Sequence, residues 1–124
     1  THSVVDFMPD QNDEIDKGGT LRLGAYPCMV QPGTTLARCY GAEQISERHR
    51  HRFEFNDDYR ERFEAAGMKC VGENPDTHLV EVVELPDKKW YIGTQYHPEY
   101  SSTVLSPNPL FVSFVKAAIA NRKK

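Results

Sequence analysis

The chain has 124 residues, 39% of them hydrophobic and 27% charged, which suffices for one domain or for part of a larger one. This is the composition of an ordinary soluble globular protein, and no apolar run approaches the ~20 residues of a membrane-spanning helix. A formal net charge of −3 argues against a general binder of nucleic acid or of anionic membranes.

The chain start and the cysteines suggest a cellular location. Thr1 opens a polar, acid-containing segment, so no secretory signal peptide is expected. Because the first residue is not Met, we expect a fragment or a processed chain. The three cysteines are odd in number and widely spaced, and no Cys-x-x-Cys pair suggests zinc. A reducing, cytoplasmic setting fits this pattern best.

The first third of the chain is predicted to combine a loop, a strand and a short helix. Residues 6–20 are acidic and turn-rich, which favours a loop. Residues 21–30 alternate like a strand, and Pro27 is expected to interrupt it. After a turn, residues 35–44 favour a short helix that ends near Gly41.

The middle of the chain changes from helical to β patterning. Residues 48–55, "RHRHRFEF", are expected to be extended. Asn56 is a suitable N-cap for a helix that begins at residue 57, with acidic residues in its first turn and Gly67 just past its end. Three strand-like runs follow, at residues 68–72, 78–85 and 90–97.

The chain is predicted to close with a helix. After a loop over residues 101–108, Asn108 is expected to be the N-cap of this helix and Pro109 to occupy its first position. The apolar face predicted to join the core consists of Leu110, Phe111, Phe114, Val115, Ala118 and Ile119. The pattern predicts a mixed α/β fold, with His97 at the carboxyl end of a central strand, where open α/β sheets tend to carry sites.

His97 and Glu99, in "QYHPEY", are the first candidate site residues. Pro98 biases His97 toward extended backbone, so the two side chains are expected to project to the same side. A carboxylate beside an imidazole can fix its tautomer and stabilise its protonated form, as in nucleophile–His–acid devices. The alternative is a core histidine next to an unrelated surface glutamate.

The basic stretch "ERHRHRFEF" is the second candidate. If it is extended, one side carries Arg48, Arg50, Arg52 and Glu54, and the other carries His49, His51, Phe53 and Phe55. Guanidinium groups on one side favour binding of a carboxylate or phosphate. A solvated strand edge is the plain alternative. A metal site at the two histidines and nucleic-acid binding are weaker alternatives, since no third ligand is near and the chain is acidic overall.

No residue of this chain fits the nucleophile that a His–Glu pair would activate. An elbow nucleophile needs small neighbours for its sharp turn. Cys28, Cys39 and Cys70 each lie between larger residues, and the serines at 101 and 102 follow Glu99 too closely to swing back onto the imidazole. The isolated chain is therefore expected to be inactive.

Four segments carry a resemblance to a known family. They read "GGTLRLGAYPC", "GAEQISERHRHRFEFN", "VEVVELPDKKWYIGTQYHPEY" and "PNPLFVSFVKAA". With them the chain resembles the C-terminal half of the glutaminase domain of the CTP synthase family, a class I glutamine amidotransferase. The fold that this implies is α/β, a partial flavodoxin-like amidotransferase domain with a mixed sheet that lacks its N-terminal half, over residues 1–124.

The resemblance assigns roles to three residues. It implies a Cys-His-Glu triad in which His97 is the general base and acid and Glu99 the orienting carboxylate. Arg52 matches the position that binds the α-carboxylate of glutamine. The family's cysteine and oxyanion hole would lie upstream of this sequence. Tyr100 stands where Phe is commoner, which is expected to matter little.

The resemblance also implies partners. These are L-glutamine, the rest of the amidotransferase domain, a synthase domain of the same polypeptide that uses ATP and Mg, and a homotetramer in the cytoplasm. No metal or cofactor is expected in this segment, and no nucleic-acid or membrane partner. The alternatives are another class I amidotransferase or a γ-glutamyl hydrolase, and a non-catalytic interaction or assembly module.

Overall fold

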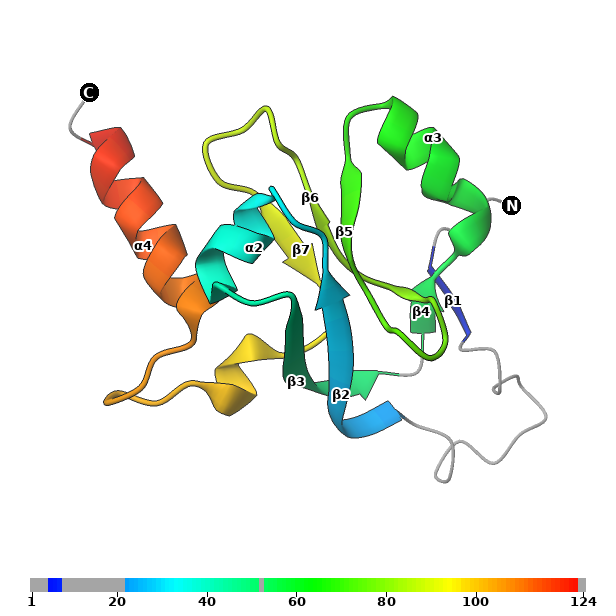
Figure 1. The fold of residues 1–124 in the computed structure, drawn as a ribbon, viewed down its shortest axis with the longest axis horizontal. Helices are drawn as coiled ribbons and strands as arrows, with labels where there is room; N and C mark the ends of the chain where they lie inside the picture. Colours follow the sequence, from blue (N-terminus) through cyan, green and yellow to red (C-terminus); the bar gives the residue numbers. More distant parts are fainter. Residues whose placement is uncertain (1–4, 8–21, 52, 123–124) are drawn as a thin grey trace.

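A computed structural model describes residues 5–7, 22–51 and 53–122, and it has the α/β architecture expected from the sequence (Figure 1). A curved five-stranded sheet has the order β3-β2-β5-β6-β7. Its strands are β2 (Arg22–Val30), β3 (Gln44–His51), β5 (Lys69–Glu73), β6 (Val80–Glu84) and β7 (Ile92–Thr94). A two-stranded sheet pairs β1 (Val5–Phe7) with β4 (Phe53–Phe55). Every strand pairing among the described residues is antiparallel.

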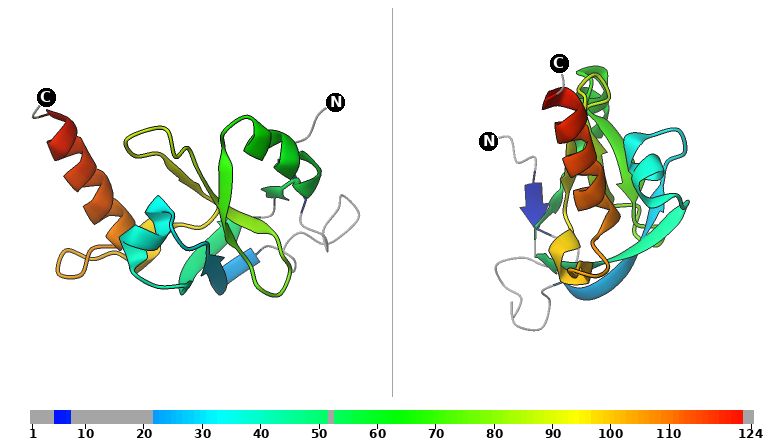
Figure 2. Two further views of the ribbon diagram at one scale, coloured as in Figure 1. Left: turned by 45° about the horizontal axis from the view of Figure 1, so that its top comes forward. Right: turned by 90° about the vertical axis from the view of Figure 1, so that its left-hand side faces the viewer.

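Helices stand at both ends of the sheet. They are α2 (Thr35–Tyr40), α3 (Arg60–Ala65), which follows the 3-10 turn η1 (Asp57–Tyr59), the 3-10 turn η2 (Pro98–Ser101) and α4 (Pro109–Arg122). Helices α2 and α4 are in contact with each other at one end, and α3 lies at the other end, against β5 (Figure 2).

Caps lie at the three positions that the sequence predicts, although Asn56 begins the 3-10 turn η1 rather than α3 itself. Gly41 ends α2 in the left-handed conformation, with φ of 65°. The Asn56 side chain accepts a hydrogen bond from the Asp58 N–H at 3.1 Å, and the Asn108 side chain accepts one from the Leu110 N–H at 2.9 Å. These contacts satisfy backbone donors that a helix start leaves unpaired.

Two apolar clusters lie against the sheet. The larger joins α2 and α4 to the strands and buries Cys28, Val30, Leu36, Val71, Val82, Tyr96 and Leu110. The smaller lies under α3 and β4 and buries Phe55, Cys70 and Val80, with Phe63 packed against it. The Phe55 and Phe63 rings meet edge to face, with centroids 5.3 Å apart.

Pro27 does not interrupt its strand, contrary to the prediction. Strand β2 is continuous, and Pro27 pairs with Ser46 of β3. Among the described residues β5 pairs with β2 only at Met29 and Val30. Pro27 therefore has one strand neighbour, and its missing N–H removes no bond to a second strand.

Two further boundary predictions are wrong in part. Residues 6 and 7, expected in a loop, belong to β1. The rest of the predicted loop over residues 6–20 lies outside the described residues. The strand expected over residues 90–97 is ordered as a strand only over β7. It is an edge strand rather than a central one, and His97 lies three residues beyond its last residue, Thr94.

Helix α4 buries less of its apolar face than predicted. Leu110 is buried, whereas 41% of Phe111, 52% of Phe114 and Val115 and 44% of Ile119 is exposed. The Trp90 ring covers part of Phe114, with centroids 5.1 Å apart. An apolar helix face left open in this way is typical of a surface that another segment or protein covers.

Gly72 supplies a stability prediction. A Cβ added to it would lie 2.8 Å from Val82 Cγ2 and 2.9 Å from Cys28 Sγ, both in the core. Because overpacking a tight core forces side chains and backbone to shift, we expect Gly72→Ala to cost about 1–3 kcal/mol of stability. Gly93→Ala, whose Cβ would meet only Val83 Cγ2 at 3.3 Å, should cost less. Urea unfolding measures both, and equal losses would contradict this explanation.

Candidate active site

His97 and Glu99 lie at the start of η2, on the turn that follows β7. His97 is the N-cap of this turn and is extended, with φ of −111° and ψ of 91°. Pro98 occupies the first position of the turn, where its missing N–H costs nothing. Glu99 is thus in a 3-10 turn and not in a strand, and the turn brings its side chain back toward the imidazole.

The two side chains are in direct contact. His97 Nδ1 lies 2.8 Å from Glu99 Oε2, while 36% of the histidine side chain and 54% of the glutamate side chain remains exposed. The hydrogen bond from His97 lowers the pKa of the Glu99 carboxyl below its ordinary value, because that bond favours the ionised form. The Tyr100 ring stacks on the imidazole at 4.9 Å between centroids. The pair is held in one orientation at an open surface.

The lowered pKa of Glu99 gives a testable prediction. A carboxyl whose pKa is depressed by folding contributes stability above its ordinary pKa, and that contribution is lost as the pH falls through the folded value. We expect a carbon-13 titration to place the Glu99 pKa below the ordinary value of a glutamate carboxyl. In a His97→Ala variant the Glu99 pKa should rise toward the ordinary value. An unchanged Glu99 pKa in that variant would contradict the contact.

Strand β3 presents the arginines next to this turn. The Arg48 and Arg50 side chains are exposed, as the alternating pattern predicts, and β3 lies at an edge of the sheet. The backbone N–H of His97 donates to the Arg48 carbonyl at 2.8 Å, which joins the turn to this strand. Arg52, the predicted carboxylate-binding residue, lies outside the described residues.

The inward side of β3 carries two buried polar residues, His49 and Glu47. His49 lies beside Glu81 of β6, with 3.5 Å between Nδ1 and Oε2, and both side chains are fully buried. Glu54, expected on the arginine side, is also buried. Within the described ranges, no group of three or more His, Cys, Asp or Glu side chains is placed to hold a metal ion.

Glu47, which sequence reasoning missed, is the second buried residue on that side. Its carboxylate accepts hydrogen bonds from Tyr40 at 2.5 Å, from Ser101 at 2.6 Å and from the side-chain amide of Asn108 at 2.7 Å. Its place between Ile45 and His49 in an alternating strand signals an inward side chain. The sequence does not indicate the three donors, which come from other elements.

None of the three cysteines contacts the imidazole. Cys28 and Cys70 are buried, and Cys39 is partly buried on α2. Burial raises the pKa of the Cys70 thiol, which favours the unreactive protonated form. In the part of the chain that the structure describes, the His97 ring contacts Glu99 and Tyr100 and is hydrogen bonded to no cysteine sulfur.

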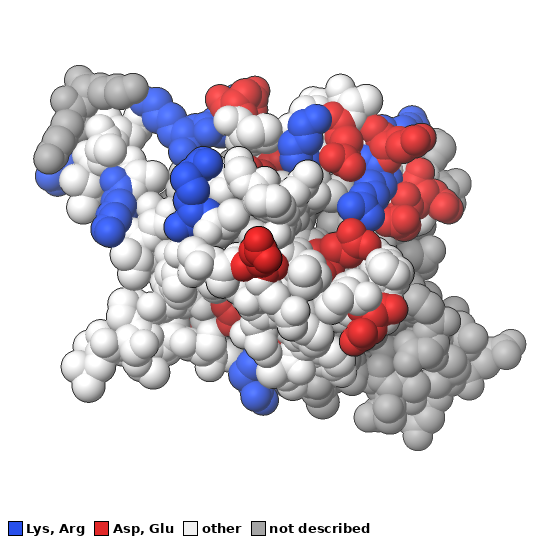
Figure 3. All heavy atoms as spheres, viewed as in Figure 1, with Lys and Arg blue, Asp and Glu red and all other residues white. Residues whose placement is uncertain are grey.

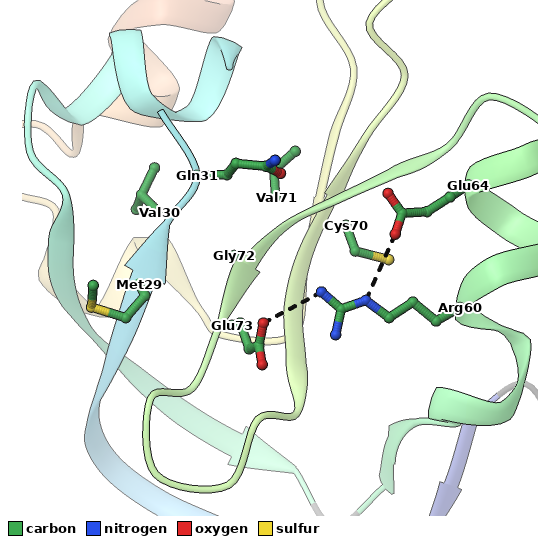
Figure 4. A pocket seen from close by; sticks show the side chains of 9 residues that line it. All are labelled: Met29, Val30, Gln31, Arg60, Glu64, Cys70, Val71, Gly72 and Glu73. Atoms are coloured by element: carbon green, nitrogen blue, oxygen red, sulfur yellow. Dashed lines mark hydrogen bonds and ion pairs between the residues drawn. The ribbon is translucent and has the colours of Figure 1, made fainter. Parts of the chain in front are cut away.

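Two surface hollows lie away from His97. One, of about 320 Å³, lies between α3 and the β2–β5 pair, and Arg60 forms ion pairs there with Glu64 and Glu73 (Figure 4). The other, of about 390 Å³, lies between α2 and α4 and is lined by Arg38 and Lys116, at the end where basic side chains gather in Figure 3. The charges of the first hollow satisfy one another, and neither hollow contains the His–Glu pair.

Residues 3–117 match the family described as glutamine amidotransferase class-I. The chain belongs to the class I glutamine amidotransferase family. Within this family it is 62% identical over 122 residues to a CTP synthase of Bacteroides thetaiotaomicron, and 58% identical over 123 residues to a CTP synthase of Porphyromonas gingivalis. These alignments take in 98% and 99% of this chain but 23% of each relative, so the amidotransferase chain spans about a quarter of their length.

A solved structure agrees with the sequence relatives. The amidotransferase chain superimposes on the glutaminase domain of Trypanosoma brucei CTPS with bound acivicin, with a TM-score of 0.87 and 34% identity. The match takes in 97% of this chain and 47% of that one. The resemblance to a CTP synthase glutaminase domain is therefore confirmed, and the chain corresponds to about half of such a domain. No described helix of the amidotransferase chain is both long and apolar enough to span a membrane.

Proposed function

We propose that this chain is the C-terminal portion of the glutaminase domain of a CTP synthase, in which glutamine hydrolysis supplies ammonia for the ATP-dependent amination of UTP to CTP. The observation that carries the proposal is the 2.8 Å contact between His97 Nδ1 and Glu99 Oε2 on an exposed turn. A buried pair could serve stability alone, but this pair is open to solvent and to a substrate.

The contact with Glu99 determines which imidazole nitrogen of His97 would transfer the proton. Because Nδ1 faces Glu99, Nε2 of His97 is the nitrogen left to accept a proton from a nucleophile. The nucleophile would be a cysteine thiol from the preceding part of the domain. His97 would take the thiol proton as the thiolate attacks the glutamine amide carbon, and would deliver it to the departing ammonia. Water would then hydrolyse the glutamyl thioester to glutamate.

The two remaining roles are substrate binding and orientation. Glu99 keeps the imidazole in one tautomer and stabilises its protonated form. Arg52 binds the α-carboxylate of glutamine as a planar, bidentate partner. In this proposal the 124-residue chain alone hydrolyses no glutamine, because the nucleophilic cysteine is in the preceding part of the domain. The ATP and Mg belong to a synthase domain, not to this segment.

The preceding half of the domain is the partner that the fold favours most directly. The open face of α4, formed by Phe111, Phe114, Val115 and Ile119, is the apolar surface it would cover. The same polypeptide would carry the synthase domain, and the enzyme would be a homotetramer in the cytoplasm. The α4 face also fits the alternative of an assembly module, so the function has to be tested by its chemistry.

Transfer of labelled nitrogen separates the alternatives. A full-length enzyme carrying this segment, given UTP, ATP, Mg and glutamine labelled with nitrogen-15 in its side-chain amide, should form CTP labelled at the C4 amino group. Labelled ammonia and glutamate without CTP would point to a γ-glutamyl hydrolase or another amidotransferase. No glutamate release at all would point to the interaction module, and either result would reject the proposal.

A further inference from the structure

The His97–Glu99 turn is too exposed for its own burial to hold the two side chains in place. Both side chains are substantially exposed, and the turn comprises only four residues. An exposed short turn samples several arrangements unless other contacts restrain it. Catalysis by the imidazole nevertheless requires its ring to be held close to one geometry. The restraint must come from residues around the turn.

Two contacts with β3 bracket the turn. At its start, the His97 N–H donates to the Arg48 carbonyl at 2.8 Å. At its end, the Ser101 hydroxyl donates to Glu47 Oε1 at 2.6 Å. Neighbouring residues of one strand, Glu47 and Arg48, therefore hold the first and last residues of the segment that presents the imidazole and its carboxylate.

A third restraint acts through Tyr96, the residue before His97. Tyr96 is 3% exposed, and its hydroxyl lies 3.1 Å from that of Tyr40. Burial raises the pKa of both phenols, so both stay protonated. Because Tyr40 gives its only O–H to Glu47, the Tyr96 hydroxyl is the donor to Tyr40. The chain before the turn is thus tied to the same carboxylate.

The Glu47 carboxylate is unusual for a buried acid. It is 3% exposed, and its hydrogen-bond partners among the described residues are three neutral donors rather than a cation. Burying a carboxylate is costly unless its oxygens are fully hydrogen bonded. The donors lie 7, 54 and 61 residues away along the chain, so the carboxylate joins α2, η2 and the start of α4 to one point of β3.

We infer that Glu47 is a positioning residue for the His97–Glu99 pair, acting through Ser101 and the two tyrosines. The catalytic part of this inference rests on the proposed glutaminase function, whereas the restraint on the turn does not. A purely structural role for the network would affect binding, synthesis and folding together. A positioning role should lower the rate of glutamine hydrolysis selectively.

Ser101 offers a sharper test than Glu47, because Ser101→Ala removes one of the three donors and leaves the carboxylate and its other two donors in place. In the full-length enzyme, Ser101→Ala should lower kcat for glutamine hydrolysis about tenfold through misplacement of the imidazole. The glutamine KM and the rate of CTP formation from ammonium chloride should stay within about twofold of the unmodified enzyme. Ser101→Thr keeps the hydroxyl and should restore kcat. Ser106→Ala, in the exposed loop that follows η2, is the matched control and should change nothing.

Hydrogen exchange provides a readout that does not depend on activity. Amides of residues 97–102 should exchange faster in Ser101→Ala and in Glu47→Gln, which keeps the shape of the side chain but removes its charge, than in Ser106→Ala. If the unmodified enzyme hydrolyses no glutamine, the proposed function fails, and faster exchange still supports the restraint. Unchanged exchange and unchanged kcat in Ser101→Ala would overturn the inference. An equal loss of glutamine-dependent and ammonia-dependent synthesis would also overturn it.

Discussion

Replacing His97 by alanine should lower glutamate release from glutamine in the full-length enzyme by about 10²–10⁴-fold, the range in which positioned acid–base groups contribute. The imidazole handles the proton in both halves of the cycle, and its Nδ1 contact with Glu99 leaves Nε2 for that task. Glutamate release is measured directly at saturating glutamine. A loss below about tenfold would mean that another group carries the proton.

Glu99→Gln and a matched control refine this prediction. Glu99 acts through the imidazole, so its loss should be smaller than that of His97. It should also be milder than the roughly 10⁴-fold loss that the corresponding amide causes in a serine triad, since a thiol needs less help from its base. His78 is a second exposed histidine paired with a glutamate, Glu73, at 3.1 Å. His78→Asn should leave activity unchanged, because Asn tolerates its positive φ of 62°.

Arg52→Ala should raise the KM for glutamine by about 10- to 100-fold, with a smaller change in kcat. A charge-assisted contact to a carboxylate is typically worth about 1.5–3 kcal/mol, which corresponds to this range. Arg52 would bind the α-carboxylate, which takes no part in the reaction at the side-chain amide. Steady-state glutaminase kinetics in the full-length enzyme measure both constants.

Two comparisons test whether the guanidinium group of Arg52 matters as such. Arg52→Lys should recover only part of the affinity, since an ammonium lacks the planar fork that matches a carboxylate. Arg50→Ala, on the exposed side of β3, is the control for a general loss of positive charge in the basic stretch. A glutamine KM that is unchanged in Arg52→Ala, or that rises equally in both alanine variants, would reject the specific role of Arg52.

The parts of the fold that the sequence predicted correctly are those set by local chemistry. Gly41, Asn56 and Asn108 each end or begin a helix through contacts within a few residues, so their patterns are readable without the rest of the chain. Pairings between distant segments were not readable. Strand β1 (Val5–Phe7) pairs with β4, about fifty residues later in the chain. Pro27 fits in β2 because β5 pairs with that strand only at Met29 and Val30.

The open face of α4 was mispredicted for a related reason. A stripe of apolar residues on a helix shows which side avoids water, but it does not say which part of the chain covers that side. The amidotransferase chain corresponds to 47% of the solved glutaminase domain it matches. Phe111, Phe114 and Val115 were therefore assigned to a core that the described residues do not complete.

The candidate site divides in the same way. His97 and Glu99 are two residues apart, so their contact could be anticipated, although a 3-10 turn rather than a strand produces it. Glu47 was overlooked because the arginines beside it drew the interpretation of "ERHRHR" toward anion binding. Its donors Ser101 and Asn108 lie 54 and 61 residues away in the sequence, and only the three-dimensional structure brings them to one carboxylate.

The nitrogen source tests the central claim most directly. CTP formation by the His97→Ala enzyme should be measured side by side with glutamine and with ammonium chloride, with His78→Asn as the control. If His97 serves glutamine hydrolysis, synthesis from glutamine should be lost while synthesis from ammonium chloride stays near that of the unmodified enzyme, because free ammonia bypasses the triad. If synthesis from both nitrogen sources falls equally in a folded His97→Ala enzyme, His97 is structural and the proposed triad is wrong.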